Sequence, residues 1–502
     1  MNYITHEIGF GWLKISYFRV LNTLFFILCC FVCSLIYAQK LDSLVYHSLQ
    51  FVEQQLTNTV AEIGDTTMSP YYTSEDGSWR TNRAPSWISG WFPGCLWYMY
   101  QWTSDDIWKK WAESWTASLD IAKTYTNTHD VGFIIFCSFG NGYHITGNET
   151  YREVIIEAAR SMAVLYDTTI GCIKPKGTNQ ELNIMIDTMM NLELLLWASK
   201  NGGEAKWTDM VVSHSLKSSE DLVRADGSTY QDVYYDAVTG DILRRGNHQG
   251  YEDSSTWARG QTWGLYGFTM VYRYTRDVRF LETAKKLADF FIDHLPDDHV
   301  PYWDFDAPDT LKDVSASATA VSALLELSTL VPEEQAKGKY WLAALDILTS
   351  LCSSAYLAEG TNSSGILLHG IQNRNQNKGI DVSLIYADYY FIEALLRYQM
   401  LSTSVVASED LNRIPLSIQL FQNYPNPFNS ATAIWYELSF STNVTLTVYD
   451  VTGRLVRTLK NDFHEAGVHQ LVFNSERFSS GIYFLVLQAG NEMTSRKMTL
   501  IQ

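Results

Sequence analysis

The sequence is poor in charged residues, and basic residues are the scarcer kind. Only 18% of its 502 residues are Asp, Glu, Lys or Arg, and 37 basic residues stand against 55 acidic ones. The resulting net charge of -18 leaves no basic stripe for nucleic-acid phosphates, so we expect no nucleic-acid partner. The 46% of hydrophobic residues argues against a disordered chain and allows a large core.

Several chemical signatures are also missing. No HExxH, P-loop, GxGxxG or GxSxG motif occurs, so the sequence predicts no metal and no cofactor. Three of the seven cysteines lie near the N-terminus, and the other four are far apart without CxxC spacing. We expect these four to be buried free thiols, with a single disulfide as the alternative in an exported chain: Cys95, Cys137, Cys172 and Cys352.

Aromatic residues are abundant, at 14% of the chain with 16 Trp, 30 Tyr and 23 Phe. Tryptophan-rich clefts often stack on sugars and other flat ligands. The alternative is that large aromatic side chains fill the core of a big helical domain. Composition alone leaves both interpretations open.

The N-terminus carries an apolar run, Leu24–Cys33, inside the longer stretch Val20–Ala38. Lys14 and Arg19 precede it, and a small residue, Ala38, ends it. This pattern predicts a secretory signal peptide over residues 1–38, leaving a mature protein without a permanent membrane span. An uncleaved anchor is the alternative, because about 20 apolar residues span a bilayer.

Helical periodicity dominates residues 39–400. One β-like stretch, Thr229–Leu243, reads as a hairpin with its turn at Thr239-Gly240. Twelve helices in six hairpins favour an (α/α)6 barrel, in which loops at one end form the active site; a helical solenoid competes, but no strict repeat is present. The expected helices are 41–63, 89–103, 105–126, 130–146, 150–166, 187–200, 205–223, 256–275, 279–294, 314–330, 337–356 and 383–400.

Two aspartates stand out because each precedes an apolar helix. Asp187 lies inside the run Asn183–Asn191, and Asp130 follows His129. Either could be a helix N-cap. The functional interpretation is an acid/base pair, since two carboxyl groups are the usual equipment for breaking glycosidic bonds and an apolar setting raises a carboxyl pKa.

A third motif runs from His248-Gln249 to Trp263. Arg259 lies between Trp257 and Trp263 near a predicted helix start. A guanidinium flanked by indole rings can clamp a carboxylate while the rings stack on the attached sugar. The alternative is a helix start with two core tryptophans and a surface arginine.

The composition changes after Tyr398. A polar segment over residues 401–417 reads as a linker, and from residue 418 to 502 short alternating strands predict a small β-sandwich. The segments NYPNPFN, VYDVTGRLV and GIYFLVL resemble the C-terminal sorting domain of the type IX secretion system. The resemblance implies the secretion machinery as a partner and a secreted or surface protein; a small immunoglobulin-like module is the alternative.

The region from Asp42 to Tyr398 resembles glycoside hydrolase family 88, the unsaturated glucuronyl hydrolases. The resemblance implies a mainly α, (α/α)6-barrel enzyme that removes a 4,5-unsaturated uronic acid from the non-reducing end of lyase-generated oligosaccharides. Five ordered segments carry it: SWISGWFPGCLW at 86–97, HDVGF at 129–133, IDTMMNLELLLW at 186–197, the segment 226–267 and KGIDVSLIYADYYFIEAL at 378–395.

Carried over by motif, Asp187 would be the general acid/base and Asp130 the second essential aspartate. The resemblance implies that the following residues contact the substrate: Trp91, Gln231, His248, Gln249, Trp257, Arg259, Trp263 and Lys378. Arg259 as the partner of the carboxylate is a physical inference.

Two departures from the family pattern bear on substrate choice. Gln231 stands where the family often has His, and an amide does not titrate. The loop that matches the Ser-x-x-Ser-x-Lys of sulfate-preferring members keeps Lys378 but replaces both serines by amides, which leaves Arg374 and Lys378 for an anionic neighbouring sugar.

The sequence thus predicts a secreted hydrolase of glycosaminoglycan or ulvan fragments. An unsaturated rhamnogalacturonyl hydrolase on the same barrel is one alternative. A non-catalytic carbohydrate-binding surface protein is another, although a binder has no need for a carboxylate inside an apolar run.

Overall fold

The computed structural model describes residues 40–176, 182–409, 419–420, 423, 426–438, 442–464, 467–475, 478–489 and 492–501. The chain forms two compact units that divide between Gln399 and Met400. The predicted signal peptide, residues 1–38, lies outside the described residues, as does part of the predicted linker. Residues 401–409 of that linker belong to helix α14, Ile385–Glu409, so the helical pattern continues past residue 400.

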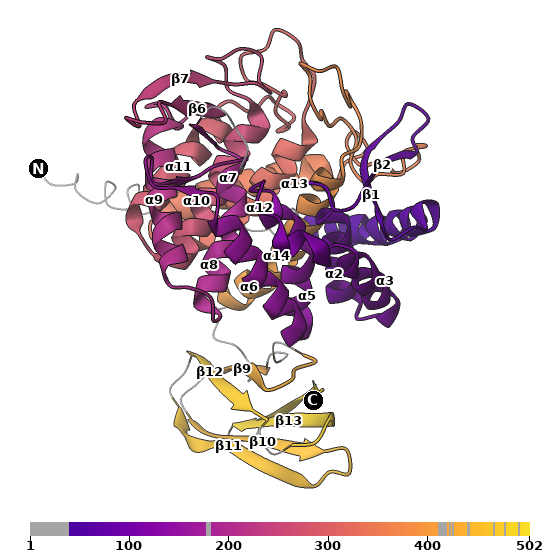
Figure 1. Cartoon of the computed structure of the whole chain (residues 1–502). Helices are drawn as coiled ribbons and strands as arrows, with labels where there is room; N and C mark the ends of the chain where they lie inside the picture. Colours follow the sequence, from indigo (N-terminus) through magenta and orange to yellow (C-terminus); the bar gives the residue numbers. More distant parts are fainter. Residues whose placement is uncertain are drawn as a thin grey trace, which may run out of the picture. The chain divides into compact units, whose positions relative to one another are not determined.

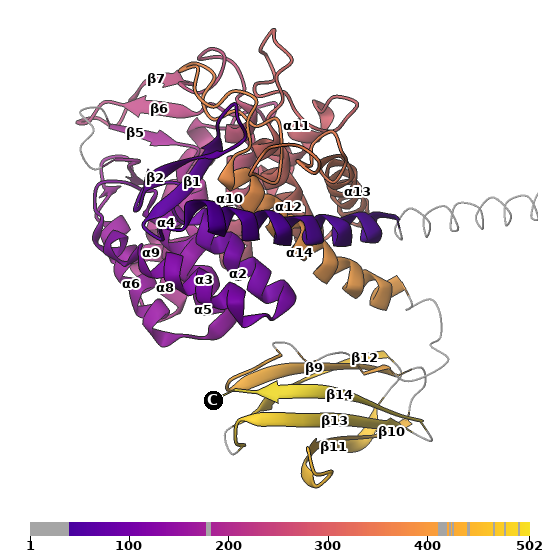
Figure 2. The same cartoon turned by 90° about the vertical axis from the view of Figure 1, so that its right-hand side faces the viewer.

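The first unit is an α/α barrel, as the sequence predicts (Figures 1 and 2). Helices buried on nearly every side alternate along the chain with amphipathic ones. Its helices are 40–63, α2 Trp91–Thr103, α3 Asp106–Ala117, α4 Val131–Ile135, α5 Asn141–Thr146, α6 Glu149–Ala163, α7 Thr188–Asn191, α8 Glu193–Lys200, α9 Lys206–Asp221, α10 Ala258–Thr275, α11 Val278–Asp293, α12 Val314–Leu330, α13 Glu334–Leu351 and α14.

The alternation follows from side-chain composition. Helix α12 carries small and apolar residues on all faces and is buried along almost its whole length, which is the environment of an inner helix. Helix α11 buries only one stripe, including Phe280, Leu287 and Phe291, as an outer helix does. Trp91, Trp97, Trp207 and Trp263 are among the largest fully buried side chains, so much of the aromatic excess belongs to the core.

Short antiparallel sheets join the helices, and one of them positions the site. Strand β5, Leu182–Met185, pairs with β6, Asp232–Tyr235, which pairs with β7, Ile242–Gly246 (Figure 2). The predicted hairpin is confirmed by β6 and β7. The sequence did not predict β5, nor the hairpin of β1, Met68–Thr73, with β2, Trp79–Arg83.

The second unit is a small β domain, again as predicted. One sheet has the order β11-β10-β13-β14 and the other β12-β9-β8. Its core is formed by apolar side chains that alternate along the strands, such as Val444, Leu446 and Val448 on β10. The strands are β8 Gln419–Leu420, β9 Ala431–Leu438, β10 Thr442–Asp450, β11 Leu455–His464, β12 Gly467–Asn474, β13 Gly481–Ala489 and β14 Glu492–Leu500.

Two further expectations can be compared with the described residues. The four cysteines of the barrel are free and buried, which confirms the thiol prediction and excludes the disulfide among them. None of the described helices is both long enough and apolar enough to cross a bilayer.

Candidate active site

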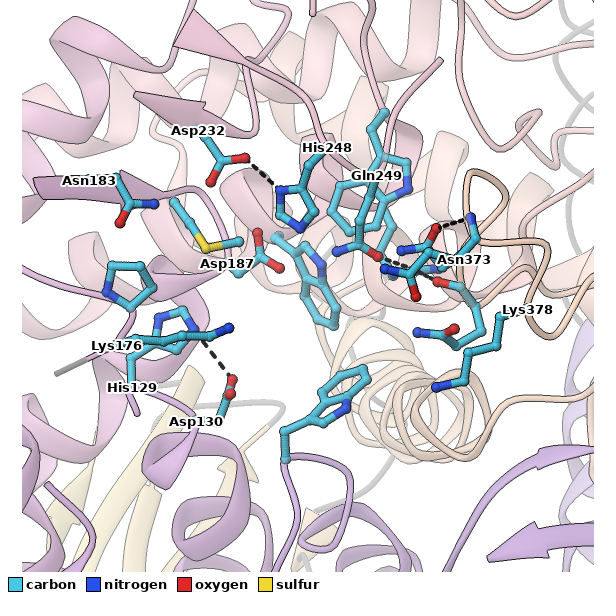
Figure 3. A pocket seen from close by; sticks show the side chains of 18 of the residues that line it. His129, Asp130, Lys176, Asn183, Asp187, Asp232, His248, Gln249, Asn373 and Lys378 are labelled. Atoms are coloured by element: carbon cyan, nitrogen blue, oxygen red, sulfur yellow. Dashed lines mark hydrogen bonds and ion pairs between the residues drawn. The ribbon is translucent and has the colours of Figure 1, made fainter. Parts of the chain in front are cut away.

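The barrel contains a pocket of about 830 Å³ into which residues from distant parts of the chain project (Figure 3). Eight of the ten residues predicted from the sequence line it: Asp130, Asp187, His248, Gln249, Trp257, Arg259, Trp263 and Lys378. The tertiary fold therefore brings together segments that are separated by almost 250 residues in the sequence.

A close contact between α4 and α7 places the two predicted acidic residues on one pocket. The amide N–H of Phe133 donates to Asn191 Oδ1 at 2.8 Å, and a Cβ atom on Gly132 would lie only 2.6 Å from Asn191 Cα. Glycine is required at position 132 because any side chain there would push the two helices apart. Asp130 and Asp187 each directly precede one of these helices.

Asp187 is the residue immediately before α7, but its side chain makes no capping hydrogen bond. Its Oδ2 is buried and has no hydrogen-bond partner among the described residues. Burial raises the pKa of Asp187, the charges of His129 and His248 lower it, and the net shift is upward. The N-cap interpretation is therefore wrong for this side chain, which is available to the pocket as a proton donor.

Asp130 likewise makes no capping hydrogen bond to α4. Its Oδ2 accepts from Thr128 Oγ1 at 2.9 Å, and its Oδ1 lies 3.4 Å from His129 Nε2. The other ring nitrogen of His129 lies 2.8 Å from the hydroxyl of Thr188, on α7. The His129 ring thus bridges the loop that carries Asp130 to the helix that follows Asp187.

His248 and Asp232 form a second polar pair in the pocket. His248 Nδ1 lies 2.6 Å from Asp232 Oδ2, and the side chain of His248 is 50% exposed whereas that of Asp232 is 2% exposed. The pairing of β6 with β7 sets Asp232 opposite Gly246, directly below the loop that holds His248. Sequence reasoning missed Asp232, although its position next to Gln231 in a singled-out motif was a usable signal.

Arg259 lies in the pocket wall with its guanidinium already engaged. Its Nη1 donates to Asp313 Oδ2 at 2.7 Å and to the carbonyl of Ile371 at 2.6 Å, and its Nη2 donates to the carbonyl of Gln372 at 2.8 Å. Arg259 and Asp313 are buried, so the charge of the guanidinium is neutralised within the protein. These contacts suit Arg259 to hold the 371–372 segment in place better than to bind a ligand carboxylate.

The two predicted residues that do not line the pocket support those that do. Gln231 is buried, and its Oε1 accepts from the backbone N–H of Gln249 at 2.8 Å. Trp91 is fully buried and packs against Phe133 and Trp87, with ring centroids 4.9 and 5.2 Å apart. The structure thus places both residues behind the pocket surface, where direct contact with a ligand is not expected.

The loop after Ile371 supplies the far side of the pocket. Asn373 and Lys378 pair across its turn, and both line the pocket together with Gln376. Lys378 Nζ lies 4.9 Å from the centre of the Tyr71 ring and forms no salt bridge among the described residues. Arg374 instead pairs with Asp309 at 3.3 Å and does not line the pocket.

Other pocket residues were not predicted from the sequence. Lys176 lies on the opposite side from Lys378, near Asp130 (Figure 3). Tyr71 and Trp87 form an aromatic wall with ring centroids 5.8 Å apart, and burial raises the pKa of Tyr71 to about 12. Trp87 lies in the quoted segment 86–97 but was not singled out, and no local pattern marked Lys176 or Tyr71, because each comes from a loop or short strand whose neighbours are set by the fold. No cluster of His, Cys, Asp or Glu suited to a metal occurs in the described part of the chain.

An α/α barrel whose pocket presents two aspartates and aromatic walls has the design of a glycoside hydrolase. The sequence comparisons agree: residues 59–336 match the model of Glycosyl Hydrolase Family 88, and residues 422–502 match the Secretion system C-terminal sorting domain. The chain therefore belongs to glycosyl hydrolase family 88 and carries a secretion sorting domain at its C-terminal end.

Similar proteins are named as unsaturated glucuronyl hydrolases or as unsaturated chondroitin disaccharide hydrolases. An unsaturated glucuronyl hydrolase of Formosa agariphila is 40% identical over 332 residues, which cover 64% of this chain and 82% of the relative. An unsaturated chondroitin disaccharide hydrolase of Streptococcus pyogenes serotype M1 is 30% identical, covering 66% and 85%. The crystal structure of an unsaturated glucuronyl hydrolase specific for heparin matches with a TM-score of 0.69 and 37% identity, covering 72% of this chain and 98% of that one.

Proposed function

We propose that this glycoside hydrolase removes the 4,5-unsaturated uronic acid from the non-reducing end of glycosaminoglycan or ulvan fragments, with Asp187 as the general acid/base. The observation that carries the proposal is the unpartnered, buried Oδ2 of Asp187 in the pocket. The raised pKa of Asp187 favours its protonated form, which can release a proton to a reacting carbon.

The chemistry is a hydration of the vinyl ether. Asp187 donates its proton to C4, and positive charge develops at C5 and on the ring oxygen. Water then adds at C5 and returns a proton to the Asp187 carboxylate, which restores the acid. The resulting hemiketal opens, and the rearranged sugar releases the residue behind it. The overall reaction consumes one water molecule, and no step in it requires a cofactor.

Asp130 supports this reaction from the position directly before α4. Thr128 and His129 hold its carboxylate at the pocket. We assign it to the hydroxyl groups of the uronate, because a fixed carboxylate that accepts hydrogen bonds suits neighbouring sugar hydroxyls. Trp263 and Trp257 supply apolar surface for the sugar ring.

The charge and aromatic lining of the pocket and the relatives' names support the proposed substrate class. Lys176 and Lys378 form no salt bridge within the described chain, and they flank the pocket from two sides. Positive side chains at the ends of a pocket in a protein of net charge -18 suit an anionic oligosaccharide. The sorting domain supports action outside the cell, with residues 1–38 as the cleaved export signal.

The test uses the ultraviolet absorbance of the conjugated double bond, which hydration destroys. Purified protein is incubated with unsaturated disaccharides from hyaluronan, chondroitin, heparin, ulvan and rhamnogalacturonan lyase digests. We expect loss of absorbance with at least one of the first four, and about a 10²–10⁴-fold lower rate for Asp187→Asn. Asp241→Asn is the matched control, because Asp241 is exposed in the turn between β6 and β7 and does not line the pocket.

Three outcomes contradict the proposal. Full activity of Asp187→Asn would show that Asp187 is not the general acid/base. Bleaching of the rhamnogalacturonan product alone would assign the enzyme to the alternative substrate class, and binding without any bleaching would indicate a non-catalytic protein.

A further inference from the structure

Asp232 is a buried carboxylate with one visible partner. Its residue is 1% exposed, its Oδ2 lies 2.6 Å from His248 Nδ1, and its Oδ1 has no hydrogen-bond partner among the described residues. A buried carboxylate is costly unless a positive group compensates it. Among the described residues, the one basic group that bonds to Asp232 is the imidazole of His248, so the pair is favoured when His248 is protonated.

The neighbouring residue shows that this part of β6 is built to hold the 247–250 loop. Gln231 accepts from the N–H of Gln249, while Asp232 receives the ring of His248. Asn375 Nδ2 holds the same loop from the other side through the carbonyl of Gly250 at 2.7 Å. The backbone below His248 is therefore fixed, and the ring has a defined direction.

The free edge of the His248 ring faces the reacting region. Figure 3 shows the ring between Asp232 and Asp187, with Nδ1 toward Asp232. Nε2 has no hydrogen-bond partner among the described residues, and the side chain is half exposed to the pocket. An N–H at this position is available to an anionic group of the substrate beside Asp187.

The charges that face His248 come from three elements. Asp232 on β6 and Asp187 before α7 favour the imidazolium, whereas Lys176 on the segment before β5 and burial oppose it. Their sum raises the pKa of His248 above its ordinary value. The pair therefore favours a positive charge on His248, and this charge is lost as the pH rises.

We propose that Asp232 is a positioning residue that holds His248 as an imidazolium, and that His248 Nε2–H binds the carboxylate on C5 of the unsaturated uronate. This inference rests on the proposed function, because it names the partner of that substrate's anionic group. C5 is bonded to C4, where Asp187 delivers its proton, so the carboxylate must lie next to Asp187. His248 meets this condition, whereas both Nη atoms of Arg259 are already bonded to the protein.

The bound carboxylate also acts on the acid. The charge of His248 lowers the pKa of Asp187 in the free enzyme. A substrate carboxylate that pairs with His248 offsets this charge and favours the protonated form of Asp187. Substrate binding thus favours the protonated form of Asp187, which is the form needed for the first proton transfer.

The test compares an unsaturated disaccharide with its methyl ester, which keeps the absorbing double bond but lacks the charge. Loss of one charge-assisted hydrogen bond lowers affinity about 10- to 100-fold, so the wild-type enzyme should show a KM higher for the ester by that factor. In Asp232→Asn and in His248→Gln we expect this difference to shrink below about threefold. The control Asp241→Asn should show the same difference in KM between the disaccharide and its methyl ester as the wild type.

The pH dependence of KM distinguishes a positioning role of Asp232 from a merely structural one. KM of the wild type should rise with pH as His248 loses its proton, and in Asp232→Asn this rise should begin at lower pH, because the charge that favours the imidazolium is gone. His248→Gln should show no such rise, and because the ring is half exposed this variant is expected to fold.

The outcomes are distinguishable from those of the functional assay. A wild-type enzyme that bleaches no substrate overturns the proposed function and this inference with it. An active wild type whose two variants still discriminate the ester, with an unshifted pH profile, overturns the inference alone. Loss of ester discrimination in both variants supports it.

Discussion

Replacing Arg259 by Met distinguishes a structural arginine from a ligand clamp. The Arg259→Met side chain keeps a similar length but removes the charge and every donor. Arg259 is 2% exposed and its partner Asp313 is 0% exposed. Removing one member of a buried ion pair costs about 3–5 kcal/mol, since the remaining charge is left uncompensated.

The structure also predicts which second change restores stability. Asp313 caps α12 through Ser315, whose N–H donates to Oδ1 at 3.0 Å. Asp313→Asn keeps an oxygen for this cap while removing the stranded charge. We therefore expect the double variant Arg259→Met/Asp313→Asn to recover about half of the lost stability, roughly 2 kcal/mol.

Urea unfolding, followed by tryptophan fluorescence and far-ultraviolet circular dichroism, measures these differences. The difference in KM between the unsaturated disaccharide and its methyl ester is measured on the same variants where they remain folded. An Arg259→Met protein within 1 kcal/mol of the wild type that loses all preference for the free carboxylate would refute the reasoning. Arg259 would then be the carboxylate clamp, and its bonds to Asp313 and Ile371 would be incidental.

Three further predictions follow from single contacts. Gly132→Ala should lower the free energy of unfolding in urea by about 1–3 kcal/mol and reduce kcat. The reason is that the added Cβ would lie 2.6 Å from Asn191 Cα and displace α4 from α7. An unchanged kcat would contradict this prediction. Lys378→Ala should raise KM about 5- to 20-fold for disaccharides with an anionic second sugar, whereas the matched control Arg374→Ala, whose residue pairs with Asp309, should change KM less than twofold. Thiol titration with Ellman's reagent of the protein without residues 1–38 should find no reactive group in the native state and four after denaturation: Cys95, Cys137, Cys172 and Cys352.

The sequence by itself determined the parts of this protein that depend on local pattern. The repeat of apolar residues along each helix set most of the barrel helices to within a few residues, because helix amphipathicity is a property of about a dozen consecutive positions. The exceptions include α3, which ends at Ala117 within the predicted helix 105–126, and α14, which continues past residue 400 to Glu409. Alternation predicted the strands of the C-terminal domain, with β10 and β13 as clear cases, and the β6–β7 hairpin of the barrel for the same reason. Asp187 was also recognisable, since a carboxylate inside an apolar run is unusual wherever it lies.

Only the tertiary structure decided what those residues contact. Arg259 reads locally as a clamp between two tryptophans, yet its partners Asp313 and Ile371 lie 54 and 112 positions away. Strand β5 was missed because its apolar run becomes a strand only through pairing with β6, about 50 residues later. The pair of Asp232 with His248 depends on the register of β6 against β7. Charge, burial and hydrogen bonding at a site are sums over neighbours, and neighbours distant in sequence are defined only when the barrel closes.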